Sequence, residues 1–99
     1  MPILSRLHSE RVGRIKADIE TLLGREMRVR VNLGRRKVIE CNGILEEIYP
    51  NLFIVSVRKN IGEVRRISYS YADVLTKTVE LSNPQSGEDF FAWLHSKLQ

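Results

Sequence analysis

The sequence predicts a mainly β fold, namely a small five-stranded barrel with an N-terminal α-helix and a C-terminal amphipathic helix. Apolar residues recur at helical spacing before Gly24 and alternate with a period of two in short stretches up to Leu81. Helical spacing of apolar residues returns after Pro84. Five short, bent antiparallel strands within about 75 residues are expected to close into a small barrel.

The first expected element is an amphipathic helix that ends at Gly24, where a left-handed C-cap residue belongs. Ser5 or Ser9 is suited to cap its start. On the outer face, Arg14 and Asp18 are four residues apart and are interpreted as a solvated ion pair. The apolar stripe consists of Leu4, Val12, Ile15, Ile19, Leu22 and Leu23.

Strands are expected to fill the region from Gly24 to Leu81. Gly43 lies inside a long β-rich stretch and predicts a sharp bend there. Turns are predicted at residues 49–51, "YPN", and 60–62, "NIG", and one short turn at 72–75, "ADVL". In the first strand the side chains expected to face the core are Met27, Val29, Val31 and Leu33.

Residues 82–87, "SNPQSG", read as a linker, so residues 1–81 are expected to form the helix-plus-barrel domain and residues 82–99 the linker and C-terminal helix. Ser86 and Asp89 resemble a capping box at the start of that helix. We expect its apolar side to dock, either on its own barrel or on a second copy of the chain. That side consists of Phe90, Phe91, Leu94 and Leu98, with Trp93 at its edge.

Composition excludes several classes of protein. The 99-residue chain carries 42% hydrophobic and 28% charged residues, ordinary values for a globular domain. A single cysteine, Cys41, excludes an intrachain disulfide and offers no zinc-ligand spacing. Because no secretory signal or membrane span is recognisable, we expect a cytoplasmic protein that does not act at a membrane.

The inventory of reactive side chains argues against an enzyme. His8 and His95 lie at opposite ends of the chain. Cys41 is in phase with Ile39 on a predicted strand, which favours a buried and unreactive thiol. The neighbouring Glu46 and Glu47 are expected to point to opposite faces, which argues against a carboxylate pair. We therefore expect no catalysis, no metal and no cofactor.

The net charge of +4 arises in the N-terminal part, where residues 1–40 carry ten Lys/Arg against five Asp/Glu. The segment 25–37 holds six cations and one anion, and "GRRK" at 34–37 forms its densest part. Arginine offers a planar fork that matches phosphate or carboxylate. The candidate binding residues are Arg28, Arg30, Arg35, Arg36, Lys37, Arg65 and Arg66.

Two other interpretations of this region stay open. The basic turn could be a solubilising one, with cations that discourage pairing between sheet edges. Tyr69 and Tyr71 could stack on nucleic-acid bases, although their phase with Ile67 favours core packing.

The stretches "LGRRKVIECNGILEEIYPNLFIV" and "RRISYSYADVLTKTVEL" resemble the Veg family of small proteins from Gram-positive bacteria, over roughly Gly24 to Leu81. The resemblance implies an SH3-like or Sm-like barrel and a link to biofilm formation through a transcriptional regulator. The favoured hypothesis is a non-enzymatic regulatory module that holds an acidic protein partner on its basic surface. The alternative is an RNA- or DNA-binding protein that uses the same arginines.

Overall fold

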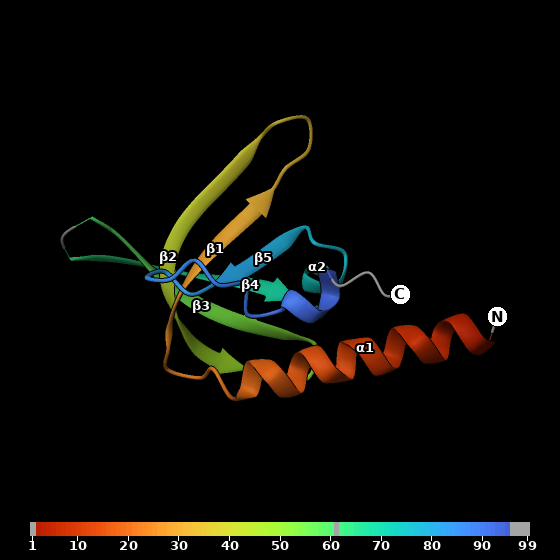
Figure 1. Cartoon of the computed structure of the whole chain (residues 1–99). Coiled ribbons are helices and arrows are strands. Elements are labelled where there is room, and N and C mark those ends of the chain that lie inside the picture. Colours follow the sequence, from red (N-terminus) through yellow and green to blue (C-terminus); the bar gives the residue numbers. More distant parts are fainter. Residues whose placement is uncertain (1, 61, 96–99) are drawn as a thin grey trace.

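The computed structural model describes residues 2–60 and 62–95, and at residues 2–9, 59–60 and 95 their backbone only. A long helix precedes the strands and a single helical turn separates the last two strands (Figure 1). In chain order the elements are α1 (Pro2–Glu20), β1 (Glu26–Asn32), β2 (Val38–Ile48), β3 (Leu52–Asn60), β4 (Glu63–Ser70), α2 (Tyr71–Leu75), β5 (Val79–Ser82) and the 3-10 helix η1 (Ala92–His95).

The five strands form one antiparallel sheet in the order β4-β3-β2-β1-β5, which confirms the mainly β prediction. Neighbouring strands are joined by hairpins except at one end, where β5 returns to pair with β1. Within the described residues no ladder joins the outer strands β4 and β5. The closure of this sheet into a barrel therefore stays a prediction.

The predicted special role of Gly43 has a steric explanation. Gly43 lies opposite Met27 of β1 and opposite Val57 of β3, so β2 passes there from one neighbour to the other. A Cβ atom at this position would lie 2.5 Å from Val55 Cγ1 and 2.8 Å from the Ser56 carbonyl oxygen. Only glycine lets the neighbouring strand approach this closely.

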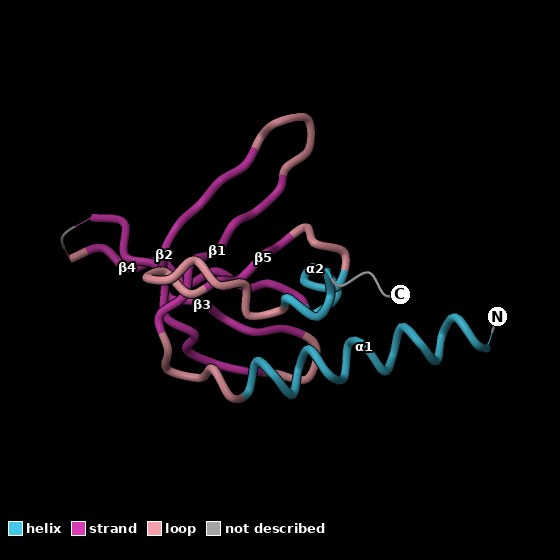
Figure 2. The backbone as a smooth tube through the Cα atoms, in the orientation of Figure 1, coloured by secondary structure: helices cyan, strands magenta, loops and turns pink. Residues whose placement is uncertain are grey.

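The core lies between the inner face of the sheet and the segments that cover it, α1, α2 and the C-terminal segment (Figure 2). Tyr71 is buried, and its hydroxyl donates hydrogen bonds to the carbonyl oxygens of Tyr49 at 2.6 Å and Leu52 at 3.1 Å. Tyr69 packs against the same cluster, so both tyrosines serve the core. The largest fully buried side chains are Tyr71, Phe53, Phe91, Ile15, Ile19, Met27, Leu45, Leu81, Val29 and Val55.

The structure corrects two expectations about the first helix. It begins at Pro2, so neither Ser5 nor Ser9 is its N-cap. It ends at Glu20, and Leu23 is 54% exposed because the turn that follows carries it off the apolar stripe. Gly24 has the predicted left-handed conformation, with φ of 85°. Within the described residues no helix has both the length and the apolar character needed to cross a membrane.

The C-terminal segment departs from the expected amphipathic helix. Ser82 forms a β-bridge with Asp89, and the Phe90 amide donates to the Leu81 carbonyl at 3.0 Å, so these residues are extended rather than helical. The Asp89 carboxylate accepts from the Phe91 amide at 2.7 Å, and in the described residues that follow β5 the helical structure is η1. Phe91 is buried in the core of its own chain. Leu98 lies outside the described residues.

Candidate functional site

The β1–β2 hairpin extends away from the rest of the molecule and carries the "GRRK" turn at its tip (Figure 1). The Leu33 amide donates to the Lys37 carbonyl at 2.7 Å and the Lys37 amide to the Gly34 carbonyl at 2.8 Å. Gly34, Arg35 and Arg36 have φ values of 91°, 40° and 66°. Three successive left-handed residues reverse the chain sharply, and two of them are not glycine, which is uncommon.

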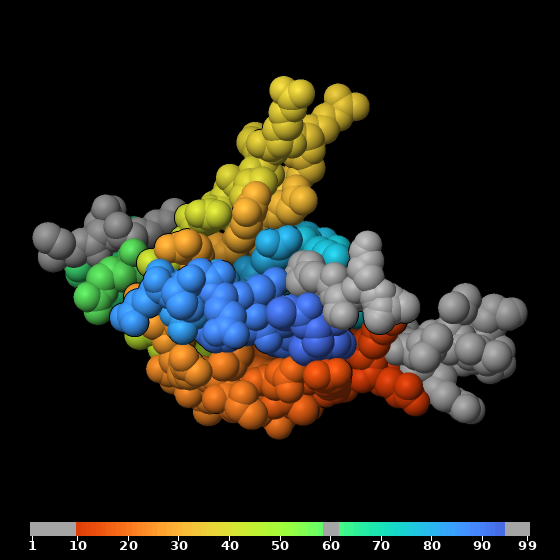
Figure 3. Space-filling model, viewed as in Figure 1, coloured from red at the N-terminus to blue at the C-terminus, as the bar shows by residue number. Residues whose placement is uncertain are grey.

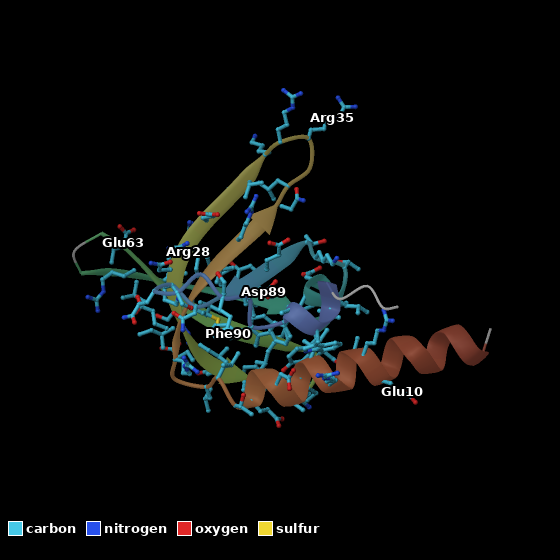
Figure 4. The ribbon with its side chains drawn as sticks, viewed as in Figure 1. Glu10, Arg28, Arg35, Glu63, Asp89 and Phe90 are labelled. Carbon is cyan, nitrogen blue, oxygen red and sulfur yellow. The ribbon has the colours of Figure 1, made fainter. Side chains whose placement is uncertain are left out.

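The three cations of this turn, Arg35, Arg36 and Lys37, are exposed. We call them the tip cations. Figure 4 shows Arg35 at the end of the hairpin, pointing away from the sheet. Among the residues that the structure describes, no ion pair involves a tip cation. Their charges are therefore available to an anionic partner.

An exposed aliphatic strip adjoins the tip cations. Leu33 and Ile39, each 52% exposed, make up this strip, whereas Val38, which is 38% exposed and adjacent to Ile39 on β2, points to the other side of the hairpin. Ile39 lies opposite Val31 and on the same side of the hairpin. This part of the hairpin extends beyond the core, so Ile39 is exposed. The prediction that Leu33 faces the core is therefore wrong. The alternation of apolar and polar residues continues along the sequence beyond the part of the sheet that the core covers. The strip was missed, although apolar residues on both sides of a basic turn are a visible signal.

Arg28 and Arg30 lie on the outer face of β1, apart from the tip cations. Arg28 is half-buried, and its guanidinium donates to the Pro84 carbonyl at 3.3 Å. Arg30 lies opposite Glu40 on one side and Glu80 on the other, with 3.9 Å between Arg30 Nη1 and Glu40 Oε2. The two glutamates thus reduce the positive potential that Arg30 presents, whereas Arg28 is held by a backbone carbonyl.

Arg65 and Arg66 do not extend a common basic surface. They are adjacent on β4 and therefore point to opposite faces of the sheet. Arg66 Nε lies 2.9 Å from Glu46 Oε1, and Arg66 Nη2 lies 2.6 Å from Glu47 Oε2. The seven predicted binding residues are therefore divided between the hairpin tip, a charge-balanced outer face and Arg65 on the other side of β4.

The Arg66 contacts also correct the expectation that Glu46 and Glu47 face opposite sides. The register shifts between Leu45 and Glu47, which marks a β-bulge at Glu46. An extra residue in one strand breaks the alternation of side chains, so both carboxylates reach the same guanidinium. Strict alternation along the sequence cannot reveal such a bulge.

Glu47 accepts a further hydrogen bond from the Tyr49 hydroxyl. This bond, with a second contribution from the positive charge of Arg66, holds the pKa of Glu47 below its ordinary value of 4.5. The same bond raises the pKa of Tyr49, because the phenol is stabilised as a donor to a carboxylate. Together these side chains form a surface ion-pair network that links β2 to β4.

Cys41 is partly buried, whereas the sequence predicted full burial. It lies opposite Val29 and packs against the edge of the core. Within the described residues there is no group of three or more His, Cys, Asp or Glu side chains that could hold a metal ion. The side chains of His8 and His95 lie outside the described part of the chain.

A family model described as "Biofilm formation stimulator VEG" matches residues 10–82. The match begins within α1, includes all five strands and ends at the last residue of β5. No curated protein matches the chain.

Proposed function

Because this chain belongs to the VEG family of biofilm formation stimulators, we propose that it is a non-enzymatic regulatory module built on an SH3- or Sm-like barrel. Its β1–β2 hairpin binds an acidic surface of a protein partner, and a transcriptional regulator is the partner class that the family resemblance implies. Binding at the hairpin is then the step that links the chain to biofilm formation.

The observation that carries this proposal is the exposed aliphatic strip beside the unpaired tip cations. Leu33 and Ile39 are each 52% exposed, although the burial of an aliphatic side chain away from water is favourable. A protein surface with acidic residues around a small apolar patch would complement both the tip cations and the aliphatic strip. Cations would steer the encounter, and burial of the strip would supply affinity.

The nucleic-acid alternative has less support from the geometry. The hairpin tip from Asn32 to Val38 contains no aromatic side chain on which a base could stack. Arg30 and Arg66, which the alternative also requires, are paired with glutamates. A phosphate backbone would meet mainly the three tip cations.

Charge reversal at the tip tests the proposal. The triple variant Arg35→Glu/Arg36→Glu/Lys37→Glu should lose the partner and fail to restore biofilm formation in a strain that lacks the chain. The fold should be retained, because exposed turn substitutions change stability by no more than about 0.5 kcal/mol each. Pull-down from native lysate with and without nuclease identifies the class of partner, and circular dichroism checks the fold.

A matched control carries the same change in net charge elsewhere. The variant Arg11→Glu/Arg58→Glu/Arg65→Glu alters three exposed cations outside the hairpin tip and should keep both partner and biofilm activity. A second variant, Leu33→Ser/Ile39→Ser, leaves the charge unchanged and should also lose the partner. The proposal of a protein-binding hairpin would be contradicted if the control variant lost the partner to the same extent. It would also be contradicted if nuclease treatment abolished the capture of the partner.

A further inference from the structure

Residues 89–94, here called the tail segment, lie on the body of the protein in the manner of a bound peptide. Figure 3 shows this part of the chain, in blue, against the orange surface of α1. The segment reaches this place through a turn at residues 83–88, in which the Asn83 amide donates to the Glu88 carbonyl at 2.8 Å. Gly87 has a left-handed φ of 80° in the same turn.

Backbone pairing provides the first group of contacts. Asp89 forms a β-bridge with Ser82, and the Phe90 amide donates to the Leu81 carbonyl at 3.0 Å. The tail segment thus adds a short extended stretch to the free edge of β5. Addition of a strand to a sheet edge is a common way in which domains bind peptides, and the backbone bonds do not depend on sequence.

Aromatic side chains provide the second group of contacts and could confer specificity. Phe91 is 2% exposed and belongs to the same core cluster as Ile15, Ile19 and Leu81. Phe90 is half-buried, with the Arg25 guanidinium carbon 5.5 Å from its ring centroid. One phenylalanine is therefore a buried anchor, and its neighbour is held at the rim.

Trp93 is held by two residues of α1. Its indole Nε1 donates to Asp18 Oδ2 at 3.0 Å, and the Arg14 guanidinium carbon lies 3.9 Å from the ring centroid. Arg14 and Asp18 were expected to be a solvated pair on the outer helix face. The structure shows instead that they clamp one indole ring from its face and its edge.

The extent of the family match separates the receptor from its occupant. Residues 10–82 contain α1 from Glu10 onward and all of β5, and thus every residue named above that holds the tail segment. The tail segment itself lies beyond the match. The groove between α1 and the β5 edge therefore belongs to the family's part of the chain, whereas its occupant does not.

We propose that this groove, formed by Arg14, Asp18, Arg25, Leu81 and Ser82, is a peptide-binding site, and that the tail segment is its resident, displaceable occupant. The ligand class is an extended segment of a partner protein with an acidic residue, two aromatic residues and a tryptophan two positions further on. This is the chemistry of Asp89, Phe90, Phe91 and Trp93. The site is distinct from the hairpin tip and does not depend on the function proposed for it.

The tether gives the resident segment an advantage over free peptides. A segment joined by a short linker acts at an effective concentration in the millimolar range, so a free segment of equal affinity cannot displace it at low concentration. The test must therefore weaken or cut the tether while the whole chain is retained. Residues 85–88 are exposed and offer a place for the cut.

The experiment uses the full chain with a specific protease site inserted between Gln85 and Ser86. A fluorescent peptide with the sequence of residues 86–99 is the probe, and its anisotropy reports binding. After cleavage we expect saturable binding with one peptide per body, because the labelled peptide exchanges with the cut tail. Before cleavage the same concentration of peptide should show at least tenfold weaker binding. Peptides with Phe91→Ala or Trp93→Ala should bind at least tenfold more weakly than the parent peptide.

A second measurement keeps the chain uncut. In the Trp93→Ala variant the resident segment loses its contacts with Asp18 and Arg14, while the groove is unaltered. The parent peptide should therefore bind this uncut variant more tightly than it binds the uncut wild-type protein. Circular dichroism of the cleaved protein checks that the body stays folded. The proposal is overturned if the body unfolds on cleavage or if a folded body fails to exchange its tail. It is also overturned if both alanine peptides bind like the parent. Dimers of the uncut chain that form by mutual tail exchange would assign the groove to a second copy instead.

Discussion

Among the six glycines, Gly43 is the one at which an added methyl group would meet other atoms of the sheet. In Gly43→Ala the new Cβ would meet Val55 Cγ1 at 2.5 Å and the Ser56 carbonyl oxygen at 2.8 Å, and the latter is backbone that cannot rotate away. We expect a loss of about 1–3 kcal/mol in the free energy of unfolding and a fall in Tm of roughly 5–20 °C. Thermal unfolding followed by circular dichroism measures it.

The same substitution in α1 is the control. Gly13 is exposed, and apart from the backbone of its own helix and its chain neighbours nothing lies within 4 Å of the place that a Cβ would take there, so Gly13→Ala should stabilise the helix by about 0.5–1 kcal/mol. A Gly43→Ala protein as stable as the wild type would show that the neighbouring strand can shift to admit the methyl group.

Glu47 links stability to pH through Tyr49. Its folded pKa lies below 4.5, first because the Tyr49 hydroxyl donates to it and second because Arg66 is close. A carboxylate with a depressed pKa stabilises the fold above the unfolded pKa, and this contribution is lost as pH falls through the folded value. In Tyr49→Phe the pKa of Glu47 should rise toward 4.5. Titration of the Glu47 carboxyl carbon by NMR measures the change, and an unaltered pKa would show that Arg66 alone sets it.

The tail segment behaves as part of the core at one residue and as a surface contact at the next. Phe91→Ala removes a side chain that is 2% exposed and should cost about 3–5 kcal/mol, whereas half-buried Phe90→Ala should cost less. Urea denaturation of both variants gives the two values. If both variants lost the same free energy of unfolding, the burial of Phe91 would not explain why the tail segment is bound to the rest of the protein.

The elements that the sequence predicted well are those whose limits carry a local signal. Gly24 has its left-handed conformation in the turn between α1 and β1, the "YPN" turn separates β2 from β3, and alternation marks the buried side of β1 at Met27 and Val29. These signals concern residues close to one another in the chain, where backbone preference and periodicity act.

The features that the sequence missed depend on distant contacts. Trp93 bonds to Asp18, 75 residues away, and Asp89 forms a β-bridge with Ser82 where helical spacing predicted the start of a helix. The bulge at Glu46 is recognisable only from the pairing of β2 with β3. The seven candidate cations were likewise grouped by charge alone, and only the fold shows that glutamates from β2 neutralise some of them.

The distribution of charge over the whole molecule predicts how binding responds to salt. The three tip cations are consecutive and exposed, and among the described residues none of them forms an ion pair. Three contacts to a single-stranded nucleic acid would give a log–log slope near −2, or about twentyfold weaker binding between about 50 and 200 mM salt. A protein partner should show a smaller loss of affinity, concentrated in the association rate. Kinetic binding measurements over this salt range decide between the two, and a slope near −2 in affinity would contradict the protein partner.

The pairing of β1 with β5 sets the order in which the sheet is expected to assemble. Hairpins such as β3–β4, in which Val55 pairs with Ile67, close short loops, whereas Val29 must wait for Leu81 to arrive. Closing a longer loop costs more chain entropy, so this last ladder should form late on the folding pathway. During the interval β1 has a free edge, and its Arg28 and Arg30 discourage pairing with another chain. We therefore expect the arginines of this strand to limit aggregation while the protein folds.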